Sequence, residues 1–168
     1  MPWQRSIRTQ RATPAEARQK AERYCAYQDR CHQEVRRKLY DLGLFRDDVD
    51  QVMAGLIEDS FLDEERFARS FARGKFRMKG WGRVRIAREL KERQVSPYCI
   101  RAGLSEIDEA AYAKTLDALM AKYVARKGEG LDDFTLKGKL YDLGQRKGYE
   151  WEVIQGAALR ALEGRPSA

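Results

Sequence analysis

Apolar residues recur every three or four positions along most of the chain. The pattern is clear at Val49, Val52, Met53 and Leu56, and it returns over residues 153–161. Such spacing gathers apolar side chains on one face of an α-helix. No stretch alternates apolar and polar residues for long enough to form a β-strand. The sequence therefore predicts an all-α protein.

The helical pattern is organised as an internal repeat. The hexapeptide Lys-Leu-Tyr-Asp-Leu-Gly occurs at residues 38–43 and again at residues 139–144, and a degenerate copy lies midway at residues 89–94. Each copy has an aromatic-bearing helical segment before it and an apolar helical segment after it. The corresponding apolar positions of the three copies are Val35, Ile86 and Leu136, and then Leu39, Leu90 and Leu140.

These observations predict three tandem three-helix repeats. A unit of about 45 residues buries its own apolar faces poorly, so we expect neighbouring repeats to stack into an elongated, curved array. The predicted organisation is a basic N-terminal arm (1–13), a first repeat (14–59), a second, basic repeat (60–107), a third repeat (108–163) and a tail (164–168).

Helix ends are marked by local signals. Residues 13–16, Thr-Pro-Ala-Glu, predict a capping box with proline in the first turn, and Ser96 followed by proline repeats the signal. Gly43 and Gly144 are expected to end helices in the left-handed conformation, and Gln94 takes that place in the middle copy as a poorer cap. The glycine-bearing segments 74–82 and 127–130 are predicted to be loops.

Charge is distributed unevenly along the 168 residues. The net charge is +7, yet residues 66–93 alone hold eleven basic and two acidic side chains, whereas residues 24–65 hold five and eleven. Residues 94–168 balance at eleven of each. A strongly basic middle favours an anionic partner, either nucleic acid or an acidic protein groove.

The candidate partner-binding residues lie in this basic segment. The arginines at 66, 69 and 73 share one helix face, and those at 85 and 88 share another. Ordinary i,i+4 pairs of Arg85 with Glu89 and Arg88 with Glu92 are the alternative interpretation. Trp81 fits both a core aromatic and a partner anchor. The candidate residues are Arg66, Arg69, Arg73, Lys75, Arg77, Lys79, Trp81, Arg83, Arg85 and Arg88.

Catalytic and cofactor signatures are not found in the sequence. His32 is the single histidine, and Cys25, Cys31 and Cys99 lack the paired spacing of a zinc site. No phosphate-binding glycine loop and no apolar run of about 18 residues occurs. We therefore predict a cytoplasmic, monomeric, non-enzymatic protein without metal, cofactor, small-molecule ligand or membrane association.

The central part of the sequence resembles the RecX family. The resemblance lies in residues 55–73 (Gly-Leu-Ile-Glu-Asp-Ser-Phe-Leu-Asp-Glu-Glu-Arg-Phe-Ala-Arg-Ser-Phe-Ala-Arg), in Lys79-Gly80, Arg83, Ile86 and Glu89-Leu90 after them, and in residues 34–39 of the first repeat. It extends over about residues 15–160. Cys31 and Gln94 depart from it, where the family often has serine and commonly has glycine.

The resemblance implies three three-helix repeats and a regulator of the RecA recombinase in DNA repair and recombination. RecX-like proteins bind RecA–DNA filaments in the helical groove, usually as inhibitors of ATPase, strand exchange and co-protease activities, and some also bind DNA. Two alternatives stay open: an autonomous DNA-binding helical module, or a general helical-repeat scaffold for another protein.

Overall fold

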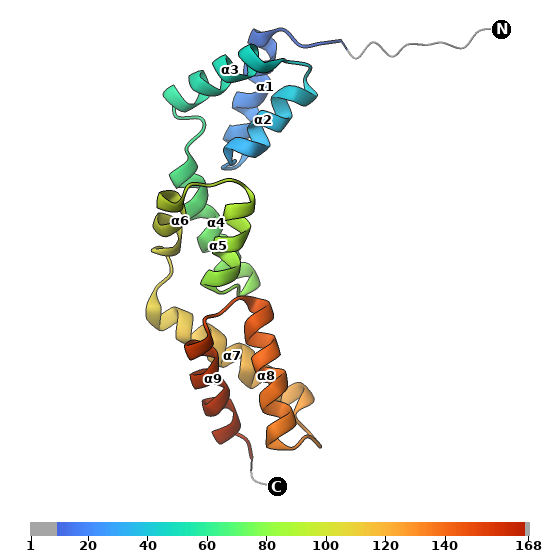
Figure 1. The fold of residues 1–168 in the computed structure, drawn as a ribbon, viewed down its shortest axis with the longest axis vertical. Helices are drawn as coiled ribbons and strands as arrows, with labels where there is room; N and C mark the ends of the chain where they lie inside the picture. The colour runs from blue at the N-terminus through green and yellow to red at the C-terminus, as the bar shows by residue number, and fades with distance from the viewer. Residues whose placement is uncertain (1–9, 167–168) are drawn as a thin grey trace, which may run out of the picture. The chain divides into compact units, whose positions relative to one another are not determined.

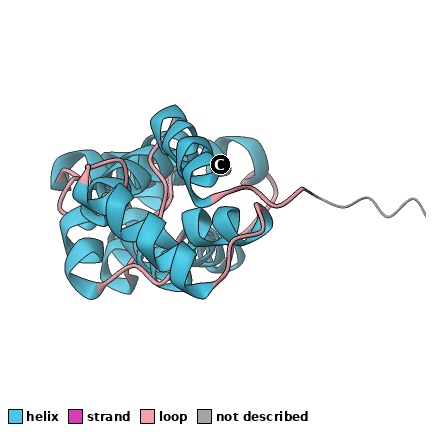
Figure 2. Ribbon diagram, turned by 90° about the horizontal axis from the view of Figure 1, so that it is seen from above, coloured by secondary structure: helices cyan, strands magenta, loops and turns pink. Residues whose placement is uncertain are grey.

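The computed structural model describes residues 10–166, and this part of the chain contains helices and loops but no strand (Figure 1, Figure 2). The predicted all-α class is confirmed. Most of the predicted N-terminal arm, with Trp3, and the last two residues of the tail lie outside the described residues. The helices are α1 (Pro14–Tyr27), α2 (His32–Asp41), α3 (Arg46–Glu58), α4 (Glu64–Lys79), α5 (Arg83–Glu92), α6 (Pro97–Leu104), α7 (Glu109–Lys127), α8 (Asp133–Lys147) and α9 (Trp151–Glu163).

The chain divides into two compact units, and the division falls inside α4, between Phe67 and Ala68. In the first unit, α1, α2 and α3 contact one another around a single apolar core. Their amphipathic faces supply it, because apolar residues at helical spacing come together when the helices pack. Its buried members are Ala17, Ala21, Cys25, Val35, Leu39, Leu44, Val49, Val52, Met53, Leu56 and Leu62.

In the second unit, α5 contacts α6, while α7, α8 and α9 contact one another. Gly103 of α6 lies against the backbone of Ala68 in α4, where a Cβ atom would come within 2.6 Å of the carbonyl oxygen. The core includes Ile86, Leu116 and Ile154, all fully buried. The six corresponding positions of the three sequence copies are all 0% exposed: Val35, Leu39, Ile86, Leu90, Leu136 and Leu140.

Several predicted helix ends are confirmed. Thr13 and Glu16 form the capping box of α1, with backbone-to-side-chain hydrogen bonds of 3.0 and 3.2 Å. Ser96 accepts from the Cys99 amide at the start of α6. Gly43 adopts the left-handed conformation with φ of 91°, and Gln94 adopts it with φ of 60° although it has a side chain.

The prediction for Gly144 is wrong, because α8 continues one turn beyond it and ends at Lys147. Gly144 is buried inside the helix, where a Cβ would come within 2.6 Å of Ile154 on α9. The left-handed residue is Gly148, with φ of 86°. The glycine of the repeated hexapeptide thus ends a helix in the first copy and permits close helix packing in the third.

The predicted loop at residues 74–82 is also largely wrong. Residues 74–79 belong to α4, and only Gly80, Trp81 and Gly82 separate it from α5. A helix-interior glycine costs only about 1 kcal/mol relative to alanine, so Gly74 does not end the helix. The chain leaves the helix at Gly80, whose φ is 65°. Segment 127–130 does contain the predicted turn, with Gly130 left-handed at φ of 77°.

Candidate interaction surface

The arginine at the start of α4 is held by its own unit. Arg66 Nε donates to Asp29 Oδ1 at 2.7 Å, and its two other guanidinium nitrogens donate to the carbonyls of Ser60 and Phe61 at 3.1 and 3.2 Å. A guanidinium with three fixed acceptors is committed to the fold. Arg66 therefore joins the turn before α4 to the loop between α1 and α2.

The next two arginines of this face share one carboxylate. Arg69 Nη1 lies 2.7 Å from Glu106 Oε1, and Arg73 Nη1 lies 3.1 Å from Glu106 Oε2. The hydrogen bond from Arg69, and then that from Arg73, lowers the pKa of Glu106. Both guanidinium groups are thereby held by an acid beyond α6, and Glu106 offsets one of their two positive charges.

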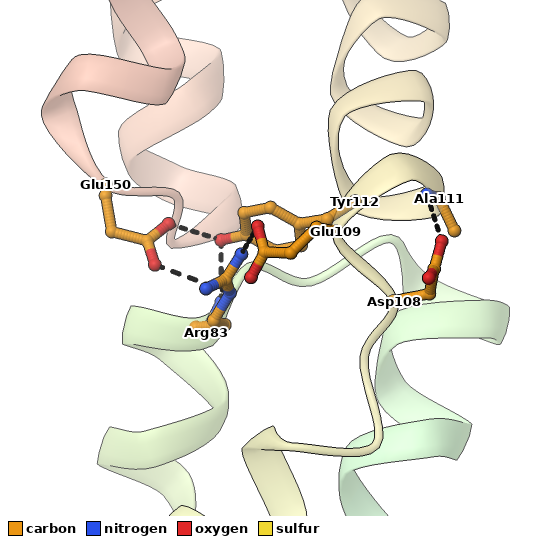
Figure 3. Close-up of polar contacts among 6 residues, drawn as sticks. All are labelled: Arg83, Asp108, Glu109, Ala111, Tyr112 and Glu150. Atoms are coloured by element: carbon orange, nitrogen blue, oxygen red, sulfur yellow. Dashed lines mark hydrogen bonds and ion pairs between the residues drawn. The ribbon is translucent and has the colours of Figure 1, made fainter.

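Arg83, the first residue of α5, is enclosed by groups from the third repeat (Figure 3). Its guanidinium lies 2.8 Å from Glu109 and 3.6 Å from Glu150, and it stacks 4.1 Å from the ring centre of Tyr112. Burial, and then the hydrogen bond that the Tyr112 hydroxyl donates to Glu150 at 2.5 Å, raises the pKa of Tyr112. Arg83 is a connection between repeats.

The first turn of α5 has no serine, threonine or aspartate cap, and the third repeat supplies the acceptors instead. The Arg83 amide donates to the Tyr112 hydroxyl at 3.0 Å, and the Val84 amide donates to the Gly148 carbonyl at 2.9 Å. The Gly82 amide donates to the Lys147 carbonyl at 2.7 Å. The carboxyl end of α8 therefore meets the amino end of α5, an arrangement that helix dipoles favour.

Trp81 lies half-buried beside this contact. Its ring packs edge-on against Phe71 at 6.5 Å, while the Arg85 guanidinium lies 4.0 Å and the Lys75 ammonium 5.0 Å from its centre. Arg85 also donates to the Arg146 carbonyl at 3.1 Å. Cations over an indole face are held in place without losing their charge. The Trp81 ring thus already contacts two cations of this chain, Lys75 and Arg85.

Three of the candidates project freely. Arg77, Lys79 and Arg88 are exposed, and their side chains form no ion pair with any residue between 10 and 166. The alternative i,i+4 pairs are not formed: Glu89 pairs with Arg93 at 3.0 Å instead of with Arg85, and Arg88 and Glu92 form no ion pair among the described residues.

Two further basic residues lie at this contact and were not predicted from the sequence. Arg146 is exposed at the end of α8, and the Lys147 ammonium donates to the Lys79 carbonyl at 3.0 Å. Their segment has balanced charge, which concealed a local basic pair. The signal available was the position of Arg-Lys directly before Gly148, at a helix end, where cations are favoured by the helix dipole.

The described residues contain no group of three or more histidine, cysteine, aspartate and glutamate side chains able to hold a metal ion. Cys25, Cys31 and Cys99 are buried free thiols. Within residues 10–166, no helix is both long enough and apolar enough to cross a bilayer. The arrangement offers fixed positive charge, which can bind anions.

Comparison with known proteins identifies the family. The model of the first three-helix domain of RecX matches residues 17–56, and that of the second matches residues 63–104. The regulatory protein RecX of Escherichia coli strain SE11 is 32% identical over 155 residues, covering 84% of this chain and 90% of that protein. The chain belongs to the RecX family.

Other RecX proteins agree with this assignment. RecX of Clostridium botulinum strain Eklund 17B is 29% identical over 131 residues, covering 77% of this chain and 60% of that protein. The crystal structure of RecX from Lactobacillus salivarius matches with a TM-score of 0.80 at 18% identity, covering 89% of this chain and 97% of that one. A second RecX crystal structure matches with a TM-score of 0.74 at 19% identity, covering 84% and 71%. These two likenesses concern the fold.

Proposed function

We propose that this RecX-family protein is a non-enzymatic inhibitor of the RecA recombinase in the cytoplasm. It would bind RecA–DNA filaments in their helical groove and lower their ATPase, strand-exchange and co-protease activities. Membership of the RecX family of regulatory proteins carries the proposal. The basic segment 66–93 supports it, because a filament containing DNA is a polyanion.

Inhibition would arise by differential binding. A ligand shifts an equilibrium only as far as its affinities for the two states differ. Contacts to neighbouring RecA protomers in one filament state would hold that state against others. Exposed cations without an internal partner are the side chains able to make such contacts, and Arg77 and Arg88 meet that description.

The test is the RecA ATPase on single-stranded DNA, titrated with this protein. ATPase activity should fall as the protein is added. The double variant Arg77→Glu with Arg88→Glu should inhibit at least about tenfold less effectively, because reversing two contact charges costs about 1.4 kcal/mol or more in binding. A wild-type protein that leaves the ATPase unchanged would contradict the proposed function.

The matched control is Lys114→Glu with Lys122→Glu. Both lysines are exposed on α7, outside the basic segment, and the change in net charge is identical. This control should inhibit as well as the wild type. If the two double variants inhibit equally, the assignment of Arg77 and Arg88 to the contact is wrong.

A further inference from the structure

The second and third repeats meet through a defined pair of surfaces. The start of α5, the second helix of its repeat, lies against the turn between α8 and α9. The Val84 amide donates to the Gly148 carbonyl at 2.9 Å, and the Arg83 guanidinium lies 3.6 Å from the Glu150 carboxylate (Figure 3). One repeat therefore receives the next at the start of its second helix.

The corresponding surface of the third repeat is open within residues 10–166. In the register of the repeated hexapeptide, Asp132 and Asp133 correspond to Gly82 and Arg83, because each pair is the N-cap and the first residue of the second helix. Beside them lies a groove of about 1010 Å³, formed by the end of α7, the loop between α7 and α8, and the end of α9. The groove thus occupies the place where a following repeat would pack.

The groove is lined by apolar and acidic side chains. Its two arginines are paired within the repeat, Arg165 with Asp133 at 2.8 Å and Arg160 with Asp117 at 2.9 Å. Two of its acids, Glu129 and Glu163, are exposed and form no ion pair with any described residue. Unpaired negative charge beside apolar surface fits a partner that presents cations around an exposed apolar side chain. The apolar and acidic lining residues include Val124, Leu131, Leu162, Glu129, Asp132, Asp133 and Glu163.

The first repeat presents such a surface at the turn between α2 and α3. This turn corresponds to the one between α8 and α9, since Gly43 and Gly148 are both left-handed, and Phe45 and Glu150, two residues later, are the N-caps of the helices that follow. The Phe45 ring is 60% exposed, and the Arg11 guanidinium lies 4.6 Å from its centre. The third repeat presents a carboxylate at this place, whereas the first repeat presents an aromatic ring with a cation.

We propose that the groove of the third repeat binds the α2–α3 turn of a second copy of this chain. Where the second and third repeats meet, a cation at the start of the second helix, Arg83, faces an acid at the turn, Glu150. In the proposed contact the acid, Asp133, is on the helix and the cation, Arg11, is at the turn, so the attraction is kept with the two signs exchanged. Arg46, exposed at the start of α3, adds a second positive charge. The inference goes beyond the proposed function and does not rest on it.

The contact should be weak and sensitive to salt. Asp47 and Asp48 follow Arg46 in the first turn of α3 and reduce the net attraction to an acidic groove. Attraction between exposed charges is also screened by salt. The two surfaces differ, so a bound pair keeps one groove and one turn open, and association does not stop at the dimer. The proposed self-association departs from the monomer predicted from the sequence.

A cationic segment of another protein is the competing occupant. The second copy is favoured because its turn has the backbone that already fits the corresponding place between the second and third repeats. That backbone is a left-handed glycine, Gly43 or Gly148, followed two residues later by a helix N-cap. Its cations also have the sign opposite to the charge of the groove. The experiment therefore uses the protein alone.

The test is sedimentation velocity of the full chain, without RecA or DNA, over a range of protein concentrations at low and high salt. The mean sedimentation coefficient should rise with concentration at low salt and rise less at high salt. The groove variant is Glu129→Lys with Glu163→Lys, and the turn variant is Arg11→Glu with Arg46→Glu. Each should associate at least about tenfold more weakly than the wild type. An equimolar mixture of the two should recover association, because each variant carries the surface that the other has lost.

The matched control for the turn variant is Lys20→Glu with Arg23→Glu. Both residues are exposed on α1, outside the turn, and the change in net charge is identical. This control should associate like the wild type, and circular dichroism establishes that every variant is folded. Equal loss in the control and the turn variant would mean that net charge alone governs association and would overturn the inference.

Three further results would overturn the proposed contact. They are a wild-type protein that stays monomeric at every concentration in low salt, association that the groove variant leaves unchanged, and a mixture of the two variants that does not recover association. The two proposals fail separately. A monomeric protein that inhibits the RecA ATPase overturns the self-association and leaves the regulatory function intact, whereas a self-associating protein that leaves the ATPase unchanged does the reverse.

Discussion

Two glycines, one inside α8 and one directly after it, show how one residue type serves different physical purposes. Gly148 has a φ of 86°, and a Cβ there would come within 2.2 Å of the Cβ of Arg85. Gly138, inside α8, has no positive φ, and a Cβ there would meet nothing within 4 Å. Conformation and close approach require glycine at the first position and neither requires it at the second.

Alanine substitution at these two positions should therefore act in opposite directions. Gly148→Ala should lower the free energy of unfolding by about 1–3 kcal/mol, because it combines backbone strain with a steric clash. Gly138→Ala should raise it by about 0.5–1 kcal/mol through lower conformational entropy of the unfolded chain. Urea unfolding measures both. Shifts of the same sign would contradict the difference between the two sites.

The sequence did not reveal which glycine ends α8. Gly43 and Gly144 stand at the same place of an identical hexapeptide, yet only Gly43 is left-handed. The difference comes from contacts with Ile154 and Arg85, which lie on other elements. Local motifs predict a cap where the helix end is free, and tertiary packing overrides them where a neighbouring helix comes close.

Among the helices, α4 shows which features can be predicted from residue spacing and which cannot. The shared face of Arg66, Arg69 and Arg73 was predictable from their spacing. Their acceptors were not, because Asp29 lies 37 residues from Arg66, and Glu106, which holds both Arg69 and Arg73, lies 37 residues from Arg69. Only the folded arrangement distinguishes these committed arginines from Arg77, at the next place on the same face.

The Glu106 pairs predict a pH dependence of stability. Arg69 and Arg73 lower the pKa of Glu106 below its unfolded value of about 4.3, so their contribution is present above that pH. It is lost as the pH falls through the lowered folded pKa. Glu106→Gln should therefore destabilise the protein at pH 7, and the difference from wild type should vanish in strong acid.

Urea unfolding of wild type and Glu106→Gln at a series of pH values measures this difference. Glu129→Gln is the control, because Glu129 is exposed in the loop after α7 and forms no ion pair with any described residue. It should match the wild type throughout. A Glu106→Gln difference that persists unchanged at low pH would mean that the carboxylate charge is not its source.

For the whole molecule, the sequence predicted the helical class, the buried repeat positions and the basic middle. It did not predict that repeats two and three meet end to end, with Gly148 and Tyr112 satisfying the first amides of α5. Arg146 and Lys147 join the basic surface only through that contact. A charge count by segment does not detect such residues, because the acids elsewhere in the segment cancel them. Residues far apart in the sequence can also be adjacent in the fold.

One buried hydroxyl contributes to this connection through two hydrogen bonds. Tyr112 is 1% exposed, and its oxygen accepts from the Arg83 amide and donates to Glu150. Tyr112→Phe leaves the amide and the carboxylate without this partner and should lower the free energy of unfolding by about 1–3 kcal/mol. Hydrogen exchange at the Arg83 amide should accelerate more than global unfolding explains.

The control is Tyr98→Phe, which removes a hydroxyl from a 64% exposed ring and should leave the free energy of unfolding nearly unchanged. Equal effects of the two substitutions would show that the buried hydroxyl does not hold the second and third repeats together.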